Sequence, residues 1–155
     1  MLGAQYRSWL WAGFALWALT AGASGRAAAG KQPTVGDLKA RLASTSIGAR
    51  PHLCVEIAQK QLEEADKQYA ANEVEKAQSE LTDVVAYAEL ARDYAIESHK
   101  HERQTEIAAR GMTRRLTDLL HSLGRDDQAP VQDAIKHLEK VRDDLLKAMF
   151  PKGAK

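Results

Sequence analysis

The sequence predicts an all-α protein, built as two antiparallel helical hairpins that share one long central helix. Three observations lead to this prediction. After residue 36 the chain is dominated by Ala, Leu, Glu, Lys, Gln and Arg, which favour helices. Apolar residues recur at spacings of three and four over most of the same region, as they do along one face of a helix. The four prolines, at positions 33, 51, 130 and 151, fall between the periodic segments and not inside them.

Residues 1–29 have the pattern of a secretory signal peptide. Arg7 provides a positive charge, and an unbroken apolar run, WLWAGFALWAL, covers residues 9–19. Small residues follow, which predicts cleavage after Ala23 or after Ala29. The alternative is an uncleaved inner-membrane anchor formed by residues 8–23, although a spanning helix needs about 20 residues. We therefore expect an exported protein of the periplasm or cell envelope.

Residues 30–50 are expected to form a linker that contains one short helix. Thr34 can cap the start of this helix, with Asp37 three residues later in the position of a capping box. Val35, Leu38 and Leu42 would share one face of it. The remainder, residues 51–150, is predicted to be a helical domain that begins with Pro51 in the first turn of its first helix.

The first and last helices of this domain each carry one apolar face. The first is expected to end near Asn72, because asparagine tolerates the left-handed conformation that closes many helices. The last begins after Pro130 and ends before Pro151. The inward positions of the first are Val55, Ala58, Leu62, Ala65 and Tyr69, and those of the last are Val131, Ala134, Leu138, Val141, Leu145 and Ala148.

A single periodic segment from about residue 73 to 123 lies between these two helices. Its register passes through Ser98, Glu102 and Thr105 without a proline or a shift, which predicts one continuous helix of about 75 Å. Gly111 is its only weak position, and Gly124 supplies the stop signal. The inward residues are Val74, Ala77, Leu81, Val84, Ala88, Ala91 and Ala95, and then Ala109, Met112, Leu116, Leu119 and Leu123.

The flanking helices are each long enough to cover only the nearer half of such a central helix. Residues 96–104 would then be uncovered, at the point where the apolar register becomes polar. A break within this segment would instead let the two halves close into a compact four-helix bundle, which is the alternative prediction.

The sequence indicates no catalytic residues, no cofactor and no metal site. It contains no glycine-rich phosphate loop and no G-x-S-x-G, C-x-x-C or H-E-x-x-H motif. Glu97 with His101, and His99 with Glu102, have the helical spacing of metal ligands. Neither pair has a third ligand, and neighbouring Lys and Arg oppose a cation, so a solvated polar segment is the preferred interpretation.

The uncovered segment is nevertheless the candidate partner-binding site, because it combines exposure with titratable side chains. Its candidate residues are Tyr94, Glu97, His99, His101 and Arg103. Histidine changes its charge in mildly acidic solution, so the contact could depend on pH. The partner would be another protein or, in a homodimer, a second copy of the chain.

Charge and cysteine content restrict the other partners. Cleavage before Arg26 removes one of the 22 basic residues and leaves 21 basic and 21 acidic residues. A chain without net charge gives no electrostatic reason to expect a nucleic acid as partner. We expect contact with a membrane only if the N-terminal segment stays uncleaved. Cys54, the only cysteine, is interpreted as a small buried hydrophobic residue, with an intermolecular disulfide as the alternative.

Residues 69–77 resemble the turn of a tetratricopeptide-type hairpin, at Asn72, Glu73, Val74 and Ala77. The chain is also similar to alanine-rich helical-hairpin envelope proteins of unknown function. The Leu-Thr pairs at 81–82 and 116–117 resemble half of the signature of Spy-type periplasmic chaperones. We therefore expect a non-catalytic interaction or structural protein of the cell envelope. The alternative is a periplasmic chaperone-like or stress-sensing binding protein.

Overall fold

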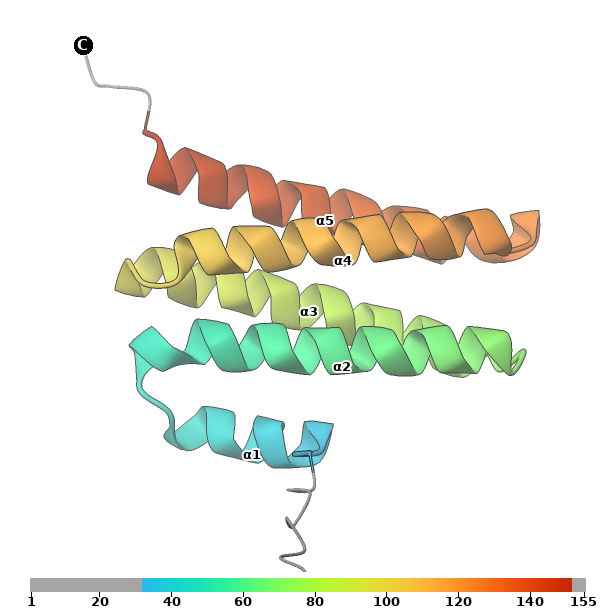
Figure 1. Ribbon diagram of the computed structural model, residues 1–155, viewed down its shortest axis with the longest axis horizontal. Helices are drawn as coiled ribbons and strands as arrows, with labels where there is room; N and C mark the ends of the chain where they lie inside the picture. Colours follow the sequence, from blue (N-terminus) through green and yellow to red (C-terminus); the bar gives the residue numbers. More distant parts are fainter. Residues whose placement is uncertain (1–31, 152–155) are drawn as a thin grey trace, which may run out of the picture. The chain divides into compact units, whose positions relative to one another are not determined.

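The computed structural model describes residues 32–151, and this part of the chain is all-helical without a strand (Figure 1). The predicted signal peptide, its cleavage sites and the alternative anchor lie outside the described residues. The helices are α1 (Val35–Ser44), α2 (Arg50–Ala70), α3 (Val74–Ser98), α4 (Glu102–Ser122) and α5 (Gln128–Met149). Single 3₁₀ turns at Ile47–Ala49 and Arg125–Asp127 precede α2 and α5.

Helix α1 begins with the predicted capping box. The Thr34 hydroxyl accepts a hydrogen bond of 3.2 Å from the Asp37 backbone N–H, and the Asp37 carboxylate accepts one of 2.9 Å from the Thr34 N–H. Leu38 is fully buried against Leu53 and Ile57 of α2. The short helix in the predicted linker is therefore packed against the helical domain.

Helices α2 and α3 form a hairpin whose turn has the predicted left-handed asparagine. Asn72 has a φ of 60°. Its N–H donates to the Tyr69 carbonyl oxygen at 3.0 Å, and the Glu73 N–H donates to the Gln68 carbonyl oxygen at 2.8 Å. This pair of bonds satisfies carbonyls at the end of α2 that have no partner within the helix.

The prediction of one continuous central helix is wrong. Helix α3 ends at Ser98 and α4 begins at Glu102, with His99 and His101 in the left-handed conformation between them. Because of this break the chain reverses direction after α3, so that α5 packs against α3 as well as α4. A straight helix would leave half of its apolar seam with a single neighbour, and burial of that seam favours the broken form. Residues 96–104 are thus the end of α3, a three-residue turn and the start of α4.

Helices α2 to α5 share one hydrophobic core. The predicted inward leucines Leu81, Leu116 and Leu138 are at most 2% exposed. Val55 and Ala148, also predicted inward, are only half-buried. Glu106 is a buried carboxylate at the margin of this core, where its Oε1 accepts a bond of 3.0 Å from Arg142 Nε. The fully or nearly buried core residues include Ala58, Leu62, Ala65, Ala77, Val84, Ala88, Ala95, Ala109, Met112, Val131, Ala134, Val141 and Leu145.

Candidate protein-binding site

The end of the helical domain that carries the α3–α4 turn is the candidate site. The turn exposes His99, Lys100 and His101 together. The segment that leads into α2 reaches the same end, because the aliphatic chain of Lys100 lies beside Gly48. Figure 1 shows that α5 also ends on this side, next to the start of α4. We call this surface the turn end, and it comprises Ile47, Arg50, Tyr94, His99, Lys100, His101 and Arg103.

Hydrogen bonds at the end of α3 determine the shape of the turn. The His99 N–H donates to the Ile96 carbonyl oxygen at 3.4 Å, and the Lys100 N–H donates to the Ala95 carbonyl oxygen at 3.2 Å. His99 has a φ of 52° and His101 a φ of 63°. This is the Schellman type of helix ending, which glycine usually provides. Here histidine takes the glycine position and places its ring in solvent.

The structure brings the predicted site residues to one end of the domain. Glu97 is exposed on the last turn of α3, and Arg103 is exposed on the first turn of α4. Tyr94 is half-buried, and the Arg50 guanidinium lies 5.2 Å from the centre of its ring, which is a cation–π contact. All five candidate residues are therefore near the turn, but not on one helical face.

Because the helix breaks between α3 and α4, the predicted metal-ligand pairs no longer have helical spacing. Glu97 and His101 belong to no common helix, since α3 ends at Ser98. His99 Nδ1 does approach Glu102 Oε1, at 3.7 Å. Among residues 32–151 no group of three His, Cys, Asp or Glu side chains is placed to hold a metal ion.

Sequence reasoning missed the contribution of Ile47 and Arg50. Arg50, the first residue of α2, lies beside Tyr94 because α2 packs against α3, and the 3₁₀ turn that contains Ile47 contacts both helices. A Cβ atom on Gly48 would lie 2.9 Å from Lys100 Cδ, so glycine leaves room for that side chain. The glycine within the loop at 44–50 was the available signal, but nothing in the sequence paired it with residue 100.

The turn end carries unpaired positive charge. Within the described chain, Arg50, Lys100 and Arg103 have no carboxylate within 4.0 Å, whereas the nearby acidic residues are Glu97 and Glu102. The Arg50 Nε–H donates to the Thr45 carbonyl oxygen at 3.0 Å. Away from this end, several charged side chains pair across helices, as Arg115 does with Asp66 at 2.6 Å. The turn end therefore presents cations that a partner could neutralise.

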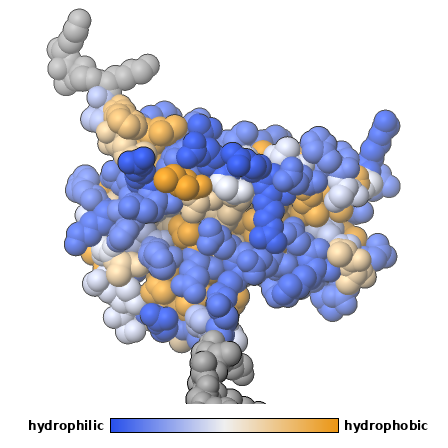
Figure 2. Space-filling view, viewed as in Figure 1, coloured by the Kyte–Doolittle hydropathy of each residue, from blue (hydrophilic) through white to orange (hydrophobic). Residues whose placement is uncertain are grey.

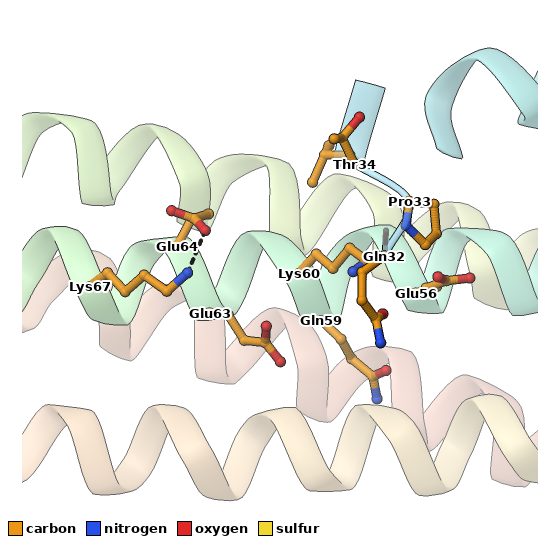
Figure 3. A pocket seen from close by; sticks show the side chains of 10 residues that line it. Gln32, Pro33, Thr34, Glu56, Gln59, Lys60, Glu63, Glu64 and Lys67 are labelled. Atoms are coloured by element: carbon orange, nitrogen blue, oxygen red, sulfur yellow. Dashed lines mark hydrogen bonds and ion pairs between the residues drawn. The ribbon is translucent and has the colours of Figure 1, made fainter. Parts of the chain in front are cut away.

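A groove of about 690 Å³ between α2 and the residues that lead into α1 is the other candidate (Figure 3). Most of the residues that line it have polar side chains. Lys67 Nζ pairs with Glu64 Oε1 at 2.7 Å, and the carboxylates of Glu56 and Glu63 do not converge with that pair in Figure 3. This arrangement has no pair of facing acids and no nucleophile beside a base, so we assign no chemistry to the groove.

Cys54 is buried, as interpreted from the sequence. Its side chain is 0% exposed, and burial raises the pKa of its thiol to about 11, although Arg50 acts in the opposite direction. The thiol is therefore protonated at neutral pH and unreactive while the protein is folded.

Comparisons of the chain with protein-family models, with characterised proteins and with solved structures found no match. Within the described part of the chain, no helix is both long enough and apolar enough to cross a bilayer. The resemblances to tetratricopeptide-type hairpins and to envelope proteins stay predictions.

Proposed function

We propose that this chain is an exported, non-catalytic interaction protein of the cell envelope, and that it binds a protein partner through the turn end. In this proposal α2 to α5 act as a compact four-helix bundle, which is a rigid support for the turn. The observation that carries the proposal is the gathering of Arg50, Lys100 and Arg103, without acidic partners among the described residues, beside two exposed histidines.

The chemistry of this surface favours an acidic protein surface as its partner. Cations that lack a partner in the free protein lose little when a carboxylate of another protein approaches them. Arg50 and Tyr94 already lie against one another at 5.2 Å, and arginine and tyrosine are enriched among the residues that dominate interface energies.

Apolar side chains at the same end support a protein partner. Ile47 is 40% exposed, and Phe150, just after α5, is 71% exposed. Figure 2 shows a mainly hydrophilic face on which apolar side chains gather where α5 ends. A surface that combines apolar and cationic groups has the composition of a protein interface.

Site-specific photo-crosslinking in the native host tests the proposal. A photoreactive amino acid at His101 should give a covalent adduct with one envelope protein, whereas the same amino acid at Ser122, exposed at the opposite end, should not. Arg103→Glu should weaken the adduct at position 101 at least about tenfold, by reversal of one interface charge. Arg125→Glu, a matched change at the opposite end, should leave it unchanged. Equal adducts at positions 101 and 122 would contradict a partner at the turn end.

Export is tested separately, because it rests on residues 1–29 alone. Mass spectrometry of the protein from its host should find a mature N-terminus between residues 24 and 30. Recovery of the intact chain from the membrane fraction would instead support the anchor at residues 8–23.

A chaperone-like binding protein is the second candidate, favoured by the exposure of Ile47 and Phe150. A surface that holds unfolded clients should bind an environment-sensitive dye in the native state. Dye binding that Ile47→Ser with Phe150→Ser abolishes, together with suppression of aggregation of an unfolded client, would favour this candidate over a single specific partner.

A further inference from the structure

The turn between α3 and α4 is short, and its backbone conformation is uncommon for its residues. Only His99, Lys100 and His101 separate the two helices, and both histidines have positive φ. Residues with a Cβ atom tolerate this conformation poorly compared with glycine. A short connection under conformational strain favours opening of the hinge.

The sequence across the turn is that of a continuous helix. The core positions Ala95, Thr105 and Ala109 are all buried, and Ser98 and Glu102 continue their spacing of three and four through the turn. Neither glycine nor proline occurs between residues 52 and 110. Straightening the turn would therefore join α3 and α4 into one helix, residues 74–122, without a shift of register.

The contacts between the two hairpins do not require them to belong to one chain. Four side-chain pairs join the α2–α3 hairpin to the α4–α5 hairpin. They are Asp66–Arg115 at 2.6 Å, Glu63–Arg115 at 3.9 Å, Arg92–Asp144 at 3.2 Å and Glu89–His137 at 3.0 Å. In a chain with a straight helix of about 74 Å, these partners would lie on opposite halves of the molecule. A second straight chain could supply each missing hairpin with the same contacts.

We propose that the protein forms a domain-swapped dimer, in which residues 99–101 straighten and each chain packs its α4–α5 hairpin on the α2–α3 hairpin of a second copy. The shared core and the four side-chain pairs are rebuilt between chains, and the left-handed histidines become helical. The swapped dimer no longer displays the turn end, so dimerisation and binding through that end exclude one another. The swap itself does not depend on the proposed partner.

Two double variants should shift the equilibrium between monomer and swapped dimer in opposite directions. His99→Gly with His101→Gly suits positive φ and weakens a helix, so it should raise the dissociation constant of the dimer at least about tenfold. His99→Ala with His101→Ala favours the continuous helix, so it should lower the dissociation constant of the dimer by at least about tenfold. His121→Ala removes an exposed histidine at the opposite end of α4 and should leave the dissociation constant unchanged. Light scattering with size-exclusion chromatography over a range of concentrations measures these constants.

An intrachain distance separates a swapped dimer from a dimer of closed monomers. Spin labels are attached through Ser79→Cys on α3 and Asp118→Cys on α4, both exposed, while the buried Cys54 stays unlabelled. Labelled chains are diluted in unlabelled chains, so that only distances within one chain are measured. The closed monomer should give a distance less than half of the about 58 Å expected for a continuous helix. The dimer fraction of the alanine variant should give the long distance.

Two results would overturn the inference. One is a dimer fraction that keeps the short intrachain distance. The other is an alanine variant that remains monomeric at about 1 mM while circular dichroism shows the helicity of the unchanged protein; at that concentration a Kd of 1 mM or tighter would be seen.

Discussion

Lys39 of α1 and Asp83 of α3 form an ion pair in which 2.9 Å separates Lys39 Nζ from Asp83 Oδ2. The side-chain amide of Gln61 on α2 donates to the same oxygen, so one carboxylate joins three helices. Burial raises the pKa of Asp83, but the hydrogen bonds from Lys39 and Gln61 outweigh it and hold that pKa below its ordinary value of 3.8. The same hydrogen bond raises the pKa of Lys39.

Asp83→Asn should loosen α1 by less than about 1 kcal/mol at neutral pH, because the Lys39 and Asp83 side chains are 38% and 45% exposed and solvent screens the pair. The folded-state pKa of Asp83 lies below the unfolded value, so its contribution is complete above about pH 4 and is lost as the pH falls through the folded-state pKa. Amide exchange of Leu38 to Leu42 measures the effect. Protection should fall in acid in the unchanged protein and less so in the variant.

Lys76→Ala is the control for this pair, since Lys76 and Glu73 pair at 3.0 Å within three residues of the same chain segment. That variant should leave the protection of α1 unchanged. Identical acid dependence in the unchanged protein and in Asp83→Asn would show that the carboxylate does not hold α1.

The core leucines provide a test of the packing of α2 to α5. Leu116→Ala and Leu138→Ala should each lower the free energy of unfolding by about 2–5 kcal/mol, because both side chains are 0% exposed and leave a cavity. Glu139→Ala, exposed on the same helix as Leu138, should change it by less than about 0.5 kcal/mol. Denaturant titrations followed by circular dichroism give these values. Similar losses at all three positions would mean that α5 is rotated relative to the packing described.

Gly111 is a position where a larger residue should stabilise the protein. It lies in the middle of α4, has no positive φ, and no atom lies within 4 Å of a Cβ placed there. Gly111→Ala should therefore raise the free energy of unfolding by about 0.5–1 kcal/mol, from the lower backbone entropy of alanine in the unfolded chain. Thermal unfolding would register the gain as a higher Tm. Gly48→Ala is the contrasting variant, because Lys100 must move to admit its methyl group; a larger gain there than at 111 would contradict the packing of the turn end.

Hydrogen exchange should be fast over fewer residues than the uncovered segment, residues 96–104, that the sequence predicted. The amides of Glu102, Arg103 and Gln104 begin α4 and have no acceptor within the helix, since Thr105 N–H is the first to bond back, to the His101 carbonyl at 2.8 Å. Residues 102–104 should therefore exchange faster than residues 90–98 and 106–116. Mass spectrometry after short labelling times would resolve the segments. Fast exchange that extends through residues 96–98 would instead indicate an opened end of α3.

Thiol reactivity tests the burial of Cys54. The folded protein should react with a disulfide reagent at pH 8 at least about a hundredfold more slowly than the unfolded protein, because the thiol is buried and its pKa is raised to about 11. Absorbance of the released thiolate follows the reaction. Rapid reaction without denaturant would show that Cys54 is accessible and able to pair with another molecule.

The sequence alone determined most of the local structure of the described chain. The capping box at Thr34 and Asp37 and the left-handed Asn72 follow from interactions between residues no more than a few positions apart. The inward positions of the helices follow from the same local geometry, since a period of 3.6 residues selects one face whichever neighbour covers it. These features could be predicted because a short stretch of chain contains their cause.

The tertiary structure decided where the central helix breaks. Ala95 to Ala109 keep a helical register, and no glycine or proline marks the turn, so local preference favours a continuous helix. Only the burial of four apolar faces in one core, which involves residues far apart in the sequence, offsets two left-handed histidines. The same long-range packing brought Arg50 to Tyr94 and Lys39 to Asp83. Those contacts could not be read from the sequence, because their cause is the return of the chain on itself.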